Sequence, residues 1–316
     1  SICFIQGLMH KMNLFHLRKW AWKIVRTILI IGISYVIFEP MIWILHFTFI
    51  DPRDLHDITV VYIPKHFTLD NFKPVFILMD YVKNLWNSVK LSLITSVLHI
   101  ISCTLVAYGF ARFRFKGRNL LFALVILTLI IPPQTIMIST YLHFRFFDIF
   151  GILEAVTGKP GVNLLDSFWP FILQSATGMG IKNGLYILIM RQFFRSMPKE
   201  IEEAALVDGA GVFRTFYTVM LPNAVPGIIT VFLFSFVWQW NDTYFVSIFL
   251  QKLMVLPTAL ASLGTNFQVM TGSSDPFYIS ILNNTGTFLM IAPIILLYIF
   301  AQRYFVESVE RSGIVG

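Results

Sequence analysis

Carboxylate side chains gather in one polar segment within the apolar second half of the chain, residues 198–222. Pro198 suits the first turn of a helix, where a missing N–H costs nothing. Glu200, Glu202 and Glu203 follow it, and acidic side chains at this end oppose the positive pole of the helix dipole. Carboxylates also accept charge-assisted hydrogen bonds from a partner. The segment therefore predicts a polar helix that docks onto something outside the membrane.

The spacing within this segment predicts a narrow helix face carrying two methyl-sized side chains. Its members recur at i, i+3, i+4 and i+7, as Ile201, Ala204, Ala205 and Asp208. Gly209 and Gly211 are predicted to end the helix, because glycine enters left-handed backbone conformations at little cost. A second short amphipathic stretch follows, with one side formed by Phe213, Phe216, Tyr217 and Met220. Leu221-Pro222 then enters an apolar run, so a helix–turn–helix lying against the membrane is predicted.

Polar and aromatic groups near the ends of two other apolar runs are candidates for contact with a solute. Tryptophan faces and amide groups suit sugar rings and hydroxyls. The candidates are Trp238, Trp240, Asn241, Asn283 and Asn284. Tryptophans at span ends also serve as interfacial anchors, so this second interpretation stays open.

The chain lacks the motifs of an enzyme or of a self-energised pump. No G-x-x-x-x-G-K-[ST] phosphate loop, H-E-x-x-H or G-x-S-x-G occurs in it. The seven histidines are scattered without metal-ligand spacing, so no metal site and no catalytic residues are predicted. Glu39 and Asp242 are the carboxylates near predicted spans, which is too few for a proton or sodium relay. A source of energy outside this chain fits these absences.

The composition is that of a polytopic helical membrane protein. The 316 residues are 56% hydrophobic and 13% charged, with a mean hydropathy of +0.72. Soluble domains carry about twice that charged fraction. Several apolar runs reach the roughly 20 residues needed to cross a hydrocarbon core. The two cysteines, Cys3 and Cys103, do not form a disulfide framework.

Six membrane spans are predicted, with both termini cytoplasmic. They cover residues 27–50, 84–110, 119–141, 166–190, 222–250 and 284–304. Fifteen of the 24 Lys and Arg residues fall in the segments placed inside and seven in those placed outside; Lys90 and Lys182 lie within spans. This excess follows the positive-inside rule and places residues 198–222 in the cytoplasm.

The second predicted span carries small polar side chains on one face. They are Ser88, Ser92, Thr95, Ser96, His99, Ser102 and Cys103, at helical spacing. Small residues let membrane helices approach closely, so this stripe is predicted to pack against other helices. His99 is expected to be hydrogen-bonded there rather than catalytic.

The polar segment resembles the EAA loop of ATP-binding-cassette (ABC) importer permeases. Glu203-Ala204-Ala205, Gly209 and Leu221-Pro222 stand at the motif's positions, with Val219 as its aliphatic residue. The resemblance implies that this is the coupling helix, which docks into a groove on the cytoplasmic ATPase. The residues it implies for coupling are Glu203, Ala204, Ala205, Asp208, Gly209, Gly211, Leu221 and Pro222.

Further motifs over residues 84–316 are similar to those of carbohydrate permeases of the maltose-transporter type. They include Asn87-Ser88, Ile131-Pro132-Pro133, Arg191-Gln192-Phe193-Phe194, Trp240-Asn241-Asp242 and Gln302-Arg303-Tyr304. The second permease subunit of those systems is the narrower resemblance. The stretch from Gly151 to Gly180 is longer than in that pattern, and Val315 replaces a lysine in the family's C-terminal tail.

The resemblance implies an all-α membrane protein with six transmembrane helices, a cytoplasmic coupling helix and the type I ABC importer permease fold. Its predicted parts are a cytoplasmic N-terminal segment (1–26), a first transmembrane helix (27–50), an extracytoplasmic loop (51–83), a permease core (84–304) that holds the coupling loop 198–222, and a cytoplasmic tail (305–316). It implies a bacterial-type plasma membrane as the location.

The implied function is that of a non-catalytic permease subunit of a binding-protein-dependent sugar or oligosaccharide importer. The implied partners are a second homologous permease, two cytoplasmic ATP-binding-cassette subunits, an extracytoplasmic sugar-binding protein and membrane lipid, without nucleic acid. This chain is expected to bind no cofactor, since ATP and Mg²⁺ are used by the ATPase. A permease for a polyol or glycerol phosphate, or a secondary transporter, are the alternatives.

Overall fold

The computed structural model describes residues 2–55, 57–149, 151–158 and 161–313. The described chain consists almost entirely of helices. It divides into two compact units, one made of residues 1–75 and 267–288 and the other of residues 76–266 and 289–316. The second unit holds the predicted coupling loop and most of the predicted permease core.

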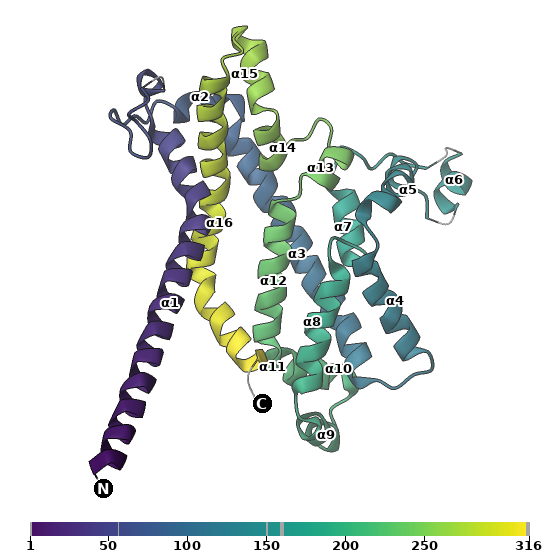
Figure 1. Cartoon of the computed structure of the whole chain (residues 1–316). Coiled ribbons are helices and arrows are strands. Elements are labelled where there is room, and N and C mark those ends of the chain that lie inside the picture. Colours follow the sequence, from purple (N-terminus) through teal and green to yellow (C-terminus); the bar gives the residue numbers. More distant parts are fainter. Residues whose placement is uncertain (1, 56, 150, 159–160, 314–316) are drawn as a thin grey trace. The chain divides into compact units, whose positions relative to one another are not determined.

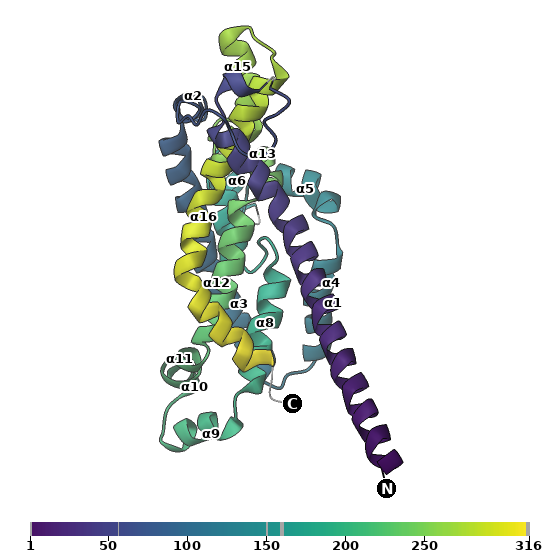
Figure 2. The same ribbon diagram turned by 60° about the vertical axis from the view of Figure 1, so that its left-hand side comes forward.

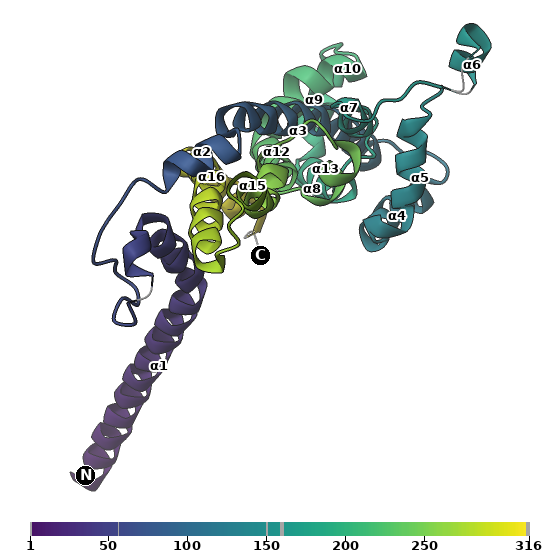
Figure 3. The same ribbon diagram turned by 90° about the horizontal axis from the view of Figure 1, so that it is seen from above.

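Three helices form the centre of the second unit: α3 (Tyr81–Arg112), α8 (Asn183–Ser196) and α12 (Val225–Trp240). α3 packs along both α8 and α12, and α7 (Trp169–Ala176) and α14 (Leu256–Ala261) also pack against α3 (Figure 1). Seen along the bundle, α3, α7, α8 and α12 group together, and α4 (Arg118–Ile130) lies beyond α8 (Figure 3). α3 is therefore the helix around which the unit is built.

The polar stripe predicted for the second span faces this centre. All seven of its side chains are buried, while Leu93, Val97 and Ile101 on the opposite side are exposed. His99 Nδ1 lies 2.6 Å from Ser235 Oγ of α12, and Ser102 Oγ donates to the Ser175 carbonyl at 2.7 Å. The predicted packing role of the stripe and the hydrogen-bonded state of His99 are confirmed.

The third predicted span, 119–141, is not one straight helix. α4 (Arg118–Ile130) and α5 (Pro133–Arg145) meet at an angle of 98°. Pro132 and Pro133 stand at the break, since proline ends the helix before it and suits the first turn of the next.

The fourth predicted span, 166–190, consists of two helices rather than one. α7 ends at Ala176 and α8 begins at Asn183. Gly178 (φ 74°) and Lys182 (φ 59°) adopt left-handed backbone conformations in the turn between them. A Cβ at Gly180 would collide with the His99 imidazole, so this turn fits closely against α3.

The fifth predicted span, 222–250, contains a bend near its start and a break after Trp240. The short helices of Val212–Asn223 and α12 form a bent pair at 74°. α12 ends at Trp240, and a separate short helix, α13 (Tyr244–Phe249), follows. The Asp242 carboxylate accepts hydrogen bonds from the backbone N–H groups of Tyr244 and Phe245, both at 3.1 Å, and so caps the start of α13.

The long segment between Gly151 and Gly180 is tied to the loop after α13. It contains α6 (Ile152–Thr157) and then Asp166, whose backbone is left-handed at φ 58°. The Asp166 Oδ1 atom accepts the backbone N–H groups of Gln251 and Lys252 at 2.6 and 2.7 Å. These two hydrogen bonds fix the loop around Asp166, whose course is not predictable from the sequence.

The first unit contains α1 (Ile2–Phe49), the 3-10 helix η1 (Pro52–Asp54) and most of α2 (Phe72–Leu78). Asn71 holds the loop by donating to the carbonyls of Thr48 and Ile50 at 3.0 and 2.8 Å. Parts of α15 (Leu263–Thr271) and α16 (Pro276–Gly313) complete this unit. The predicted tail 305–316 continues α16 as far as Gly313, and residues 314–316 lie outside the described residues.

Within the described residues, three helices are long and apolar enough to cross a membrane. They are Lys19–Phe49, Tyr81–Arg112 and Pro276–Gln302. The number rises to five if each of the two bent pairs is one span. The structure thus supports a multi-pass helical membrane protein and does not itself give the predicted six spans.

Candidate functional site

The predicted coupling loop forms two short helices joined by a tight turn. α9 (Lys199–Val207) begins after Pro198, and α10 (Val212–Thr215) begins after Gly211. In the turn, the Ala210 N–H donates to the Ala205 carbonyl at 3.0 Å and the Gly209 N–H to the Leu206 carbonyl at 3.1 Å. These two bonds form a Schellman motif, which satisfies the last carbonyls of a helix.

The two glycines of the turn differ in conformation. Gly209 has a φ of +83°, the left-handed region that the motif requires, and no atom lies within 4 Å of the position a Cβ would take. Gly211 has φ −70° and ψ 163°, an extended conformation open to any residue. Gly209 therefore sets the turn, and Gly211 marks the residue before α10.

The predicted small-residue face of α9 is accessible. No residue of α9 is buried; Ala204 and Asp208 are exposed and Ala205 is half-buried. Val207 at the tip is 87% exposed. Views from two directions place α9 at one end of the second unit and α13 at the other (Figures 1 and 2). The Glu203 side chain is exposed beside this face.

An ion pair fastens α9 to the end of α3. Glu202 Oε1 accepts the hydroxyl of Tyr108 at 2.7 Å, and Glu202 Oε2 lies 3.3 Å from Arg112 Nε. Arg112 also donates through Nη2 to the Met197 carbonyl at 3.0 Å. The sequence-based prediction named Glu203 and Asp208 as the functional carboxylates and missed the anchoring role of Glu202, Tyr108 and Arg112. The i, i+4 spacing of Tyr108 and Arg112 at the end of a span was the available signal.

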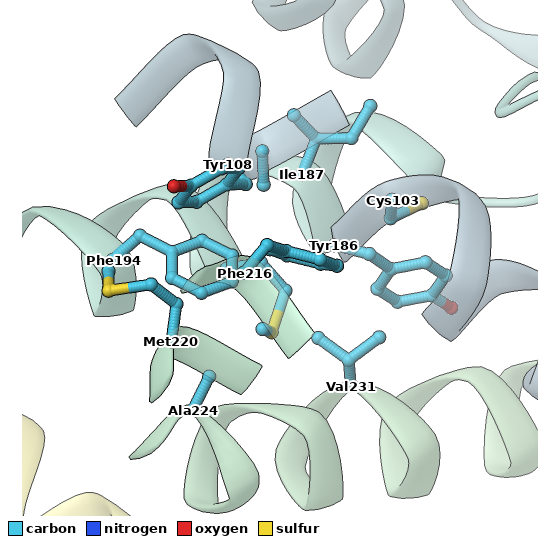
Figure 4. Packing of buried hydrophobic residues seen from close by; sticks show 11 residues of the cluster. Cys103, Tyr108, Tyr186, Ile187, Phe194, Phe216, Met220, Ala224 and Val231 are labelled. Carbon is cyan, nitrogen blue, oxygen red and sulfur yellow. The ribbon is translucent and has the colours of Figure 1, made fainter. Parts of the chain in front are cut away.

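The segment after α10 is anchored by aromatic packing. A π-helical turn, η2 (Phe216–Met220), places Phe216 and Met220 in a buried cluster with Tyr108 and Phe194 (Figure 4). The rings of Tyr108 and Phe216 have centroids 4.8 Å apart. Aromatic pairs at such distances add about 0.5–1.5 kcal/mol beyond their buried area. The turn is therefore rigidly joined to the bundle.

The predicted apolar side of this second segment is only half correct. Phe213 is 77% exposed and Tyr217 58% exposed, so only Phe216 and Met220 face the cluster. The π-helical turn widens the helical repeat, which moves the four side chains off a common face. Leu221 is half-buried against the same cluster and Pro222 is exposed.

The predicted solute-contact residues lie in different settings. Trp240 is buried, stacks on Phe236 and donates from its indole to the Met290 carbonyl at 3.2 Å. Trp238 is 45% exposed, and the Lys182 ammonium lies 4.8 Å from its ring centroid. Asn241 donates to the Val237 carbonyl at 2.9 Å. Asn283 and Asn284 belong to the first unit, and Asn284 donates to the Ser280 carbonyl at 2.8 Å.

A cavity of about 330 Å³ lies beside the turn between α7 and α8. Its polar lining includes Thr128, Thr140, Gln174, Lys182 and Asn183, and its apolar lining includes Phe245. The side-chain amide of Asn183 is buried without a hydrogen-bond partner among the described residues. Hydroxyl, amide and ammonium groups beside an aromatic ring can hold a polyhydroxylated solute.

A family model for the inner membrane component of binding-protein-dependent transport systems matches residues 100–311. The chain belongs to this family, and the helical bundle with an exposed α9 is the part that the match covers. The protein is thus a membrane-spanning permease subunit of a binding-protein-dependent transport system.

Individual relatives extend the similarity over nearly the whole chain. The arabinooligosaccharides transport system permease protein AraQ of Halalkalibacterium halodurans is 27% identical over 95% of this chain and 100% of its own length. The galactooligosaccharides transport system permease protein GanQ of Bacillus subtilis is 28% identical over 95% of this chain and 98% of its own length.

A solved structure has the same fold. It is described as a bacterial ABC transporter involved in the import of the acidic polysaccharide alginate. The likeness has a TM-score of 0.69 at 20% sequence identity and covers 90% of this chain and 96% of the other. The expected type I ABC importer permease fold agrees with this likeness and with the family match.

Proposed function

We propose that this chain is one of the two permease subunits of an ATP-driven importer for oligosaccharides. The observation that carries the proposal is the exposed helix α9, which is fastened to the bundle by Glu202, Arg112 and Tyr108. An exposed helix with a small-residue face permits close docking of a partner. Because α9 is fixed to the bundle, a movement that the partner imposes on α9 is transmitted to α3 and α8.

The partner on α9 is proposed to be a cytoplasmic ATP-binding-cassette subunit. Ala204 and Ala205 allow its surface to approach the helix backbone, and Glu203 offers charge-assisted hydrogen bonds. Asp208 and Gly209 keep the angle between α9 and α10 fixed, and Leu221 and Pro222 lead the movement into α12. ATP and Mg²⁺ are used by that subunit, since this chain carries no phosphate-binding loop.

The remaining topology follows from the basic residues and the helices together. We propose six spans with both termini in the cytoplasm, where the third, fourth and fifth spans are broken helices. Broken helices are tolerated in a membrane where neighbouring helices satisfy the freed backbone groups. The turn at Gly178–Lys182 meets this condition, because it packs against the polar stripe of α3.

The substrate class is proposed from the relatives and from the cavity beside α8. AraQ and GanQ are named for arabinooligosaccharide and galactooligosaccharide transport. The cavity is lined by the Gln174 and Asn183 amides, the Lys182 side chain and the Phe245 ring, groups suited to sugar hydroxyls and ring faces. An extracytoplasmic binding protein would deliver the oligosaccharide, and a second homologous permease would complete the pathway.

Affinity purification of the tagged chain from its native membrane tests the proposal. The expected result is that the chain brings down a second permease of this family and an ATP-binding-cassette protein. Vesicles containing this complex and its binding protein should then take up arabino- or galacto-oligosaccharides in preference to glycerol phosphate. Purification without any ATPase, or uptake of glycerol phosphate alone, would contradict it.

A further inference from the structure

A second cavity, of about 560 Å³, lies where the loop after α3 meets the start of α9. Six basic side chains line it: Arg112, Arg114, Arg118, Arg191, Arg195 and Lys199. Glu202 and Glu203 are the two acidic residues of the lining. Six cations against two carboxylates leave an excess of four positive charges around one cavity.

The excess charge is not neutralised within the described part of the chain. Arg112 is the cavity residue that has a carboxylate partner, Glu202. Arg118 donates through Nη1 to the Phe113 carbonyl at 3.2 Å, a neutral acceptor. The Arg191 guanidinium lies 3.9 Å from the Phe122 ring centroid, and its Nε atom is buried without a hydrogen-bond partner. Like charges confined at this density repel one another unless an anion joins them.

The geometry of the arginines suits a phosphate group. Guanidinium groups bind phosphate oxygens in a bidentate manner, and two or more of them together can satisfy the two non-bridging oxygens of a phosphodiester. Arg118 and Arg191 are half-buried and held by backbone and ring contacts, so less side-chain freedom is lost on binding. The cavity is therefore prepared for a compact, multiply coordinated anion.

The membrane supplies such an anion beside this cavity. Arg118 is the first residue of α4, and α4 contains no buried residue. Leu120, Leu124 and Leu127 are exposed along it at helical spacing, as expected of a surface that contacts acyl chains. A phospholipid whose head group entered the cavity would lay its chains along α4. Basic clusters next to a span are the usual binding sites of anionic lipids.

We infer that this arginine cavity binds the phosphate of an anionic phospholipid head group. This inference goes beyond the proposed transport function and needs only that the chain lies in a membrane. The bound phosphate would offset part of the excess positive charge of the arginines on α3, α4 and α8 and join them to Lys199 at the start of α9. Anionic lipid would thus stabilise the anchor of the coupling helix.

The test measures thermal unfolding of the full-length chain in a zwitterionic detergent with added lipid. Phosphatidylglycerol is expected to raise the unfolding temperature by several degrees, and phosphatidylcholine is expected to have little effect. The variant Arg118→Gln with Arg195→Gln should lose this gain and need at least tenfold more phosphatidylglycerol. In phosphatidylcholine it should be as stable as the natural chain or more so, because two repelling charges are gone.

A matched control removes the same charge elsewhere. Lys116→Gln with Arg214→Gln changes two exposed basic side chains that do not line the cavity. This variant should keep the full response to phosphatidylglycerol. If the Arg118 variant fails to fold, Arg114→Gln with Arg195→Gln, both exposed, takes its place with the same expectation.

Three results would overturn the inference. One is an equal response of the cavity variant and the control to phosphatidylglycerol. Another is equal stabilisation by inorganic phosphate at the same concentration, which would make the ligand a soluble anion. The third is an unchanged lipid response together with loss of the co-purifying ATPase, which would show that an acidic protein segment occupies the cavity.

Discussion

Single residues decide how the α9 turn is attached and how stable the loops are. Glu202 and Glu203 are neighbours of the same type, yet Glu202 binds Tyr108 and Arg112 while Glu203 stays exposed. The resemblance to the EAA motif singles out Glu203, whereas the three-dimensional structure shows that Glu202 anchors α9. The left-handed conformation of Gly209 followed from its position after the last helical residue. The left-handed conformation of Asp166 is not predictable in the same way, since glycine is the residue that usually adopts it.

The pH dependence of stability is expected to show at Asp54. His66 donates to its carboxylate through both the backbone N–H and Nδ1, each at 2.7 Å, and the side-chain bond is the larger cause that lowers the Asp54 pKa. A lowered folded-state pKa stabilises the fold above the unfolded pKa of about 3.9, and this stability is lost as the pH falls through the folded value. Asp54→Asn should therefore lower the unfolding temperature at pH 7.

Thermal unfolding of Asp54→Asn and of the natural chain between pH 7 and pH 3 measures how the contribution of Asp54 to stability depends on pH. The difference in unfolding temperature should shrink as the pH falls below about 4, because Asp54 becomes protonated. Asp70→Asn in the same loop is the control, since the Asp70 side chain is exposed and accepts from Thr68 alone, at 3.1 Å. A difference that stays constant over this range would show that charge is not the cause.

At the scale of elements, breaks in helices separate what was predictable from what was not. The bend at Pro132-Pro133 is predictable from the sequence, because proline lacks the N–H that continues a helix. The break between α7 and α8 is not, because Lys182 there adopts φ 59°, which its type does not favour. The bend before α12 is not predictable either, since no residue pattern marks the π-helical turn at 216–220. Tertiary packing decided these positions.

Close approach of α8 to α4 is predicted to depend on Gly184. A Cβ there would meet Thr128 Oγ1 at 2.7 Å and the Val125 carbonyl oxygen at 2.8 Å. Because one of these atoms is backbone, Gly184→Ala should destabilise the chain by about 1–3 kcal/mol. Thermal unfolding in detergent measures the effect.

Gly109→Ala in α3 provides the comparison for Gly184→Ala in α8. No atom lies within 4 Å of a Cβ built at Gly109, which is also helical. Alanine there should be neutral or stabilise the helix by up to about 1 kcal/mol. Equal unfolding temperatures for the two alanine variants would mean that α4 and α8 do not need the small residue.

At the scale of the whole molecule, composition and motif together predicted the class of protein. The family match over residues 100–311 confirms a binding-protein-dependent permease. The solute path is less accessible from sequence, because the five predicted contact residues include Trp240, which is buried in packing. The cavity beside α8 forms only when α4, α5 and the α7–α8 turn come together, and no local pattern records that assembly.

The central claim is that α9 and its turn transmit the energy of a separate ATPase into an otherwise passive bundle. Valine at Gly209, where φ is +83°, would add roughly 1–3 kcal/mol of backbone strain and change the angle between α9 and α10. Gly272→Val is the matched control, because Gly272 also has a left-handed backbone (φ 69°) with open space around it, outside the coupling loop.

The most direct measurement is oligosaccharide uptake per ATP hydrolysed in proteoliposomes that hold the complete complex. The natural chain and Gly272→Val should couple uptake to ATP, and Gly209→Val should insert normally but lose at least tenfold in uptake per ATP. Vesicles with this chain alone should take up nothing. Normal coupling by Gly209→Val, or uptake by the chain without its ATPase, would contradict the account.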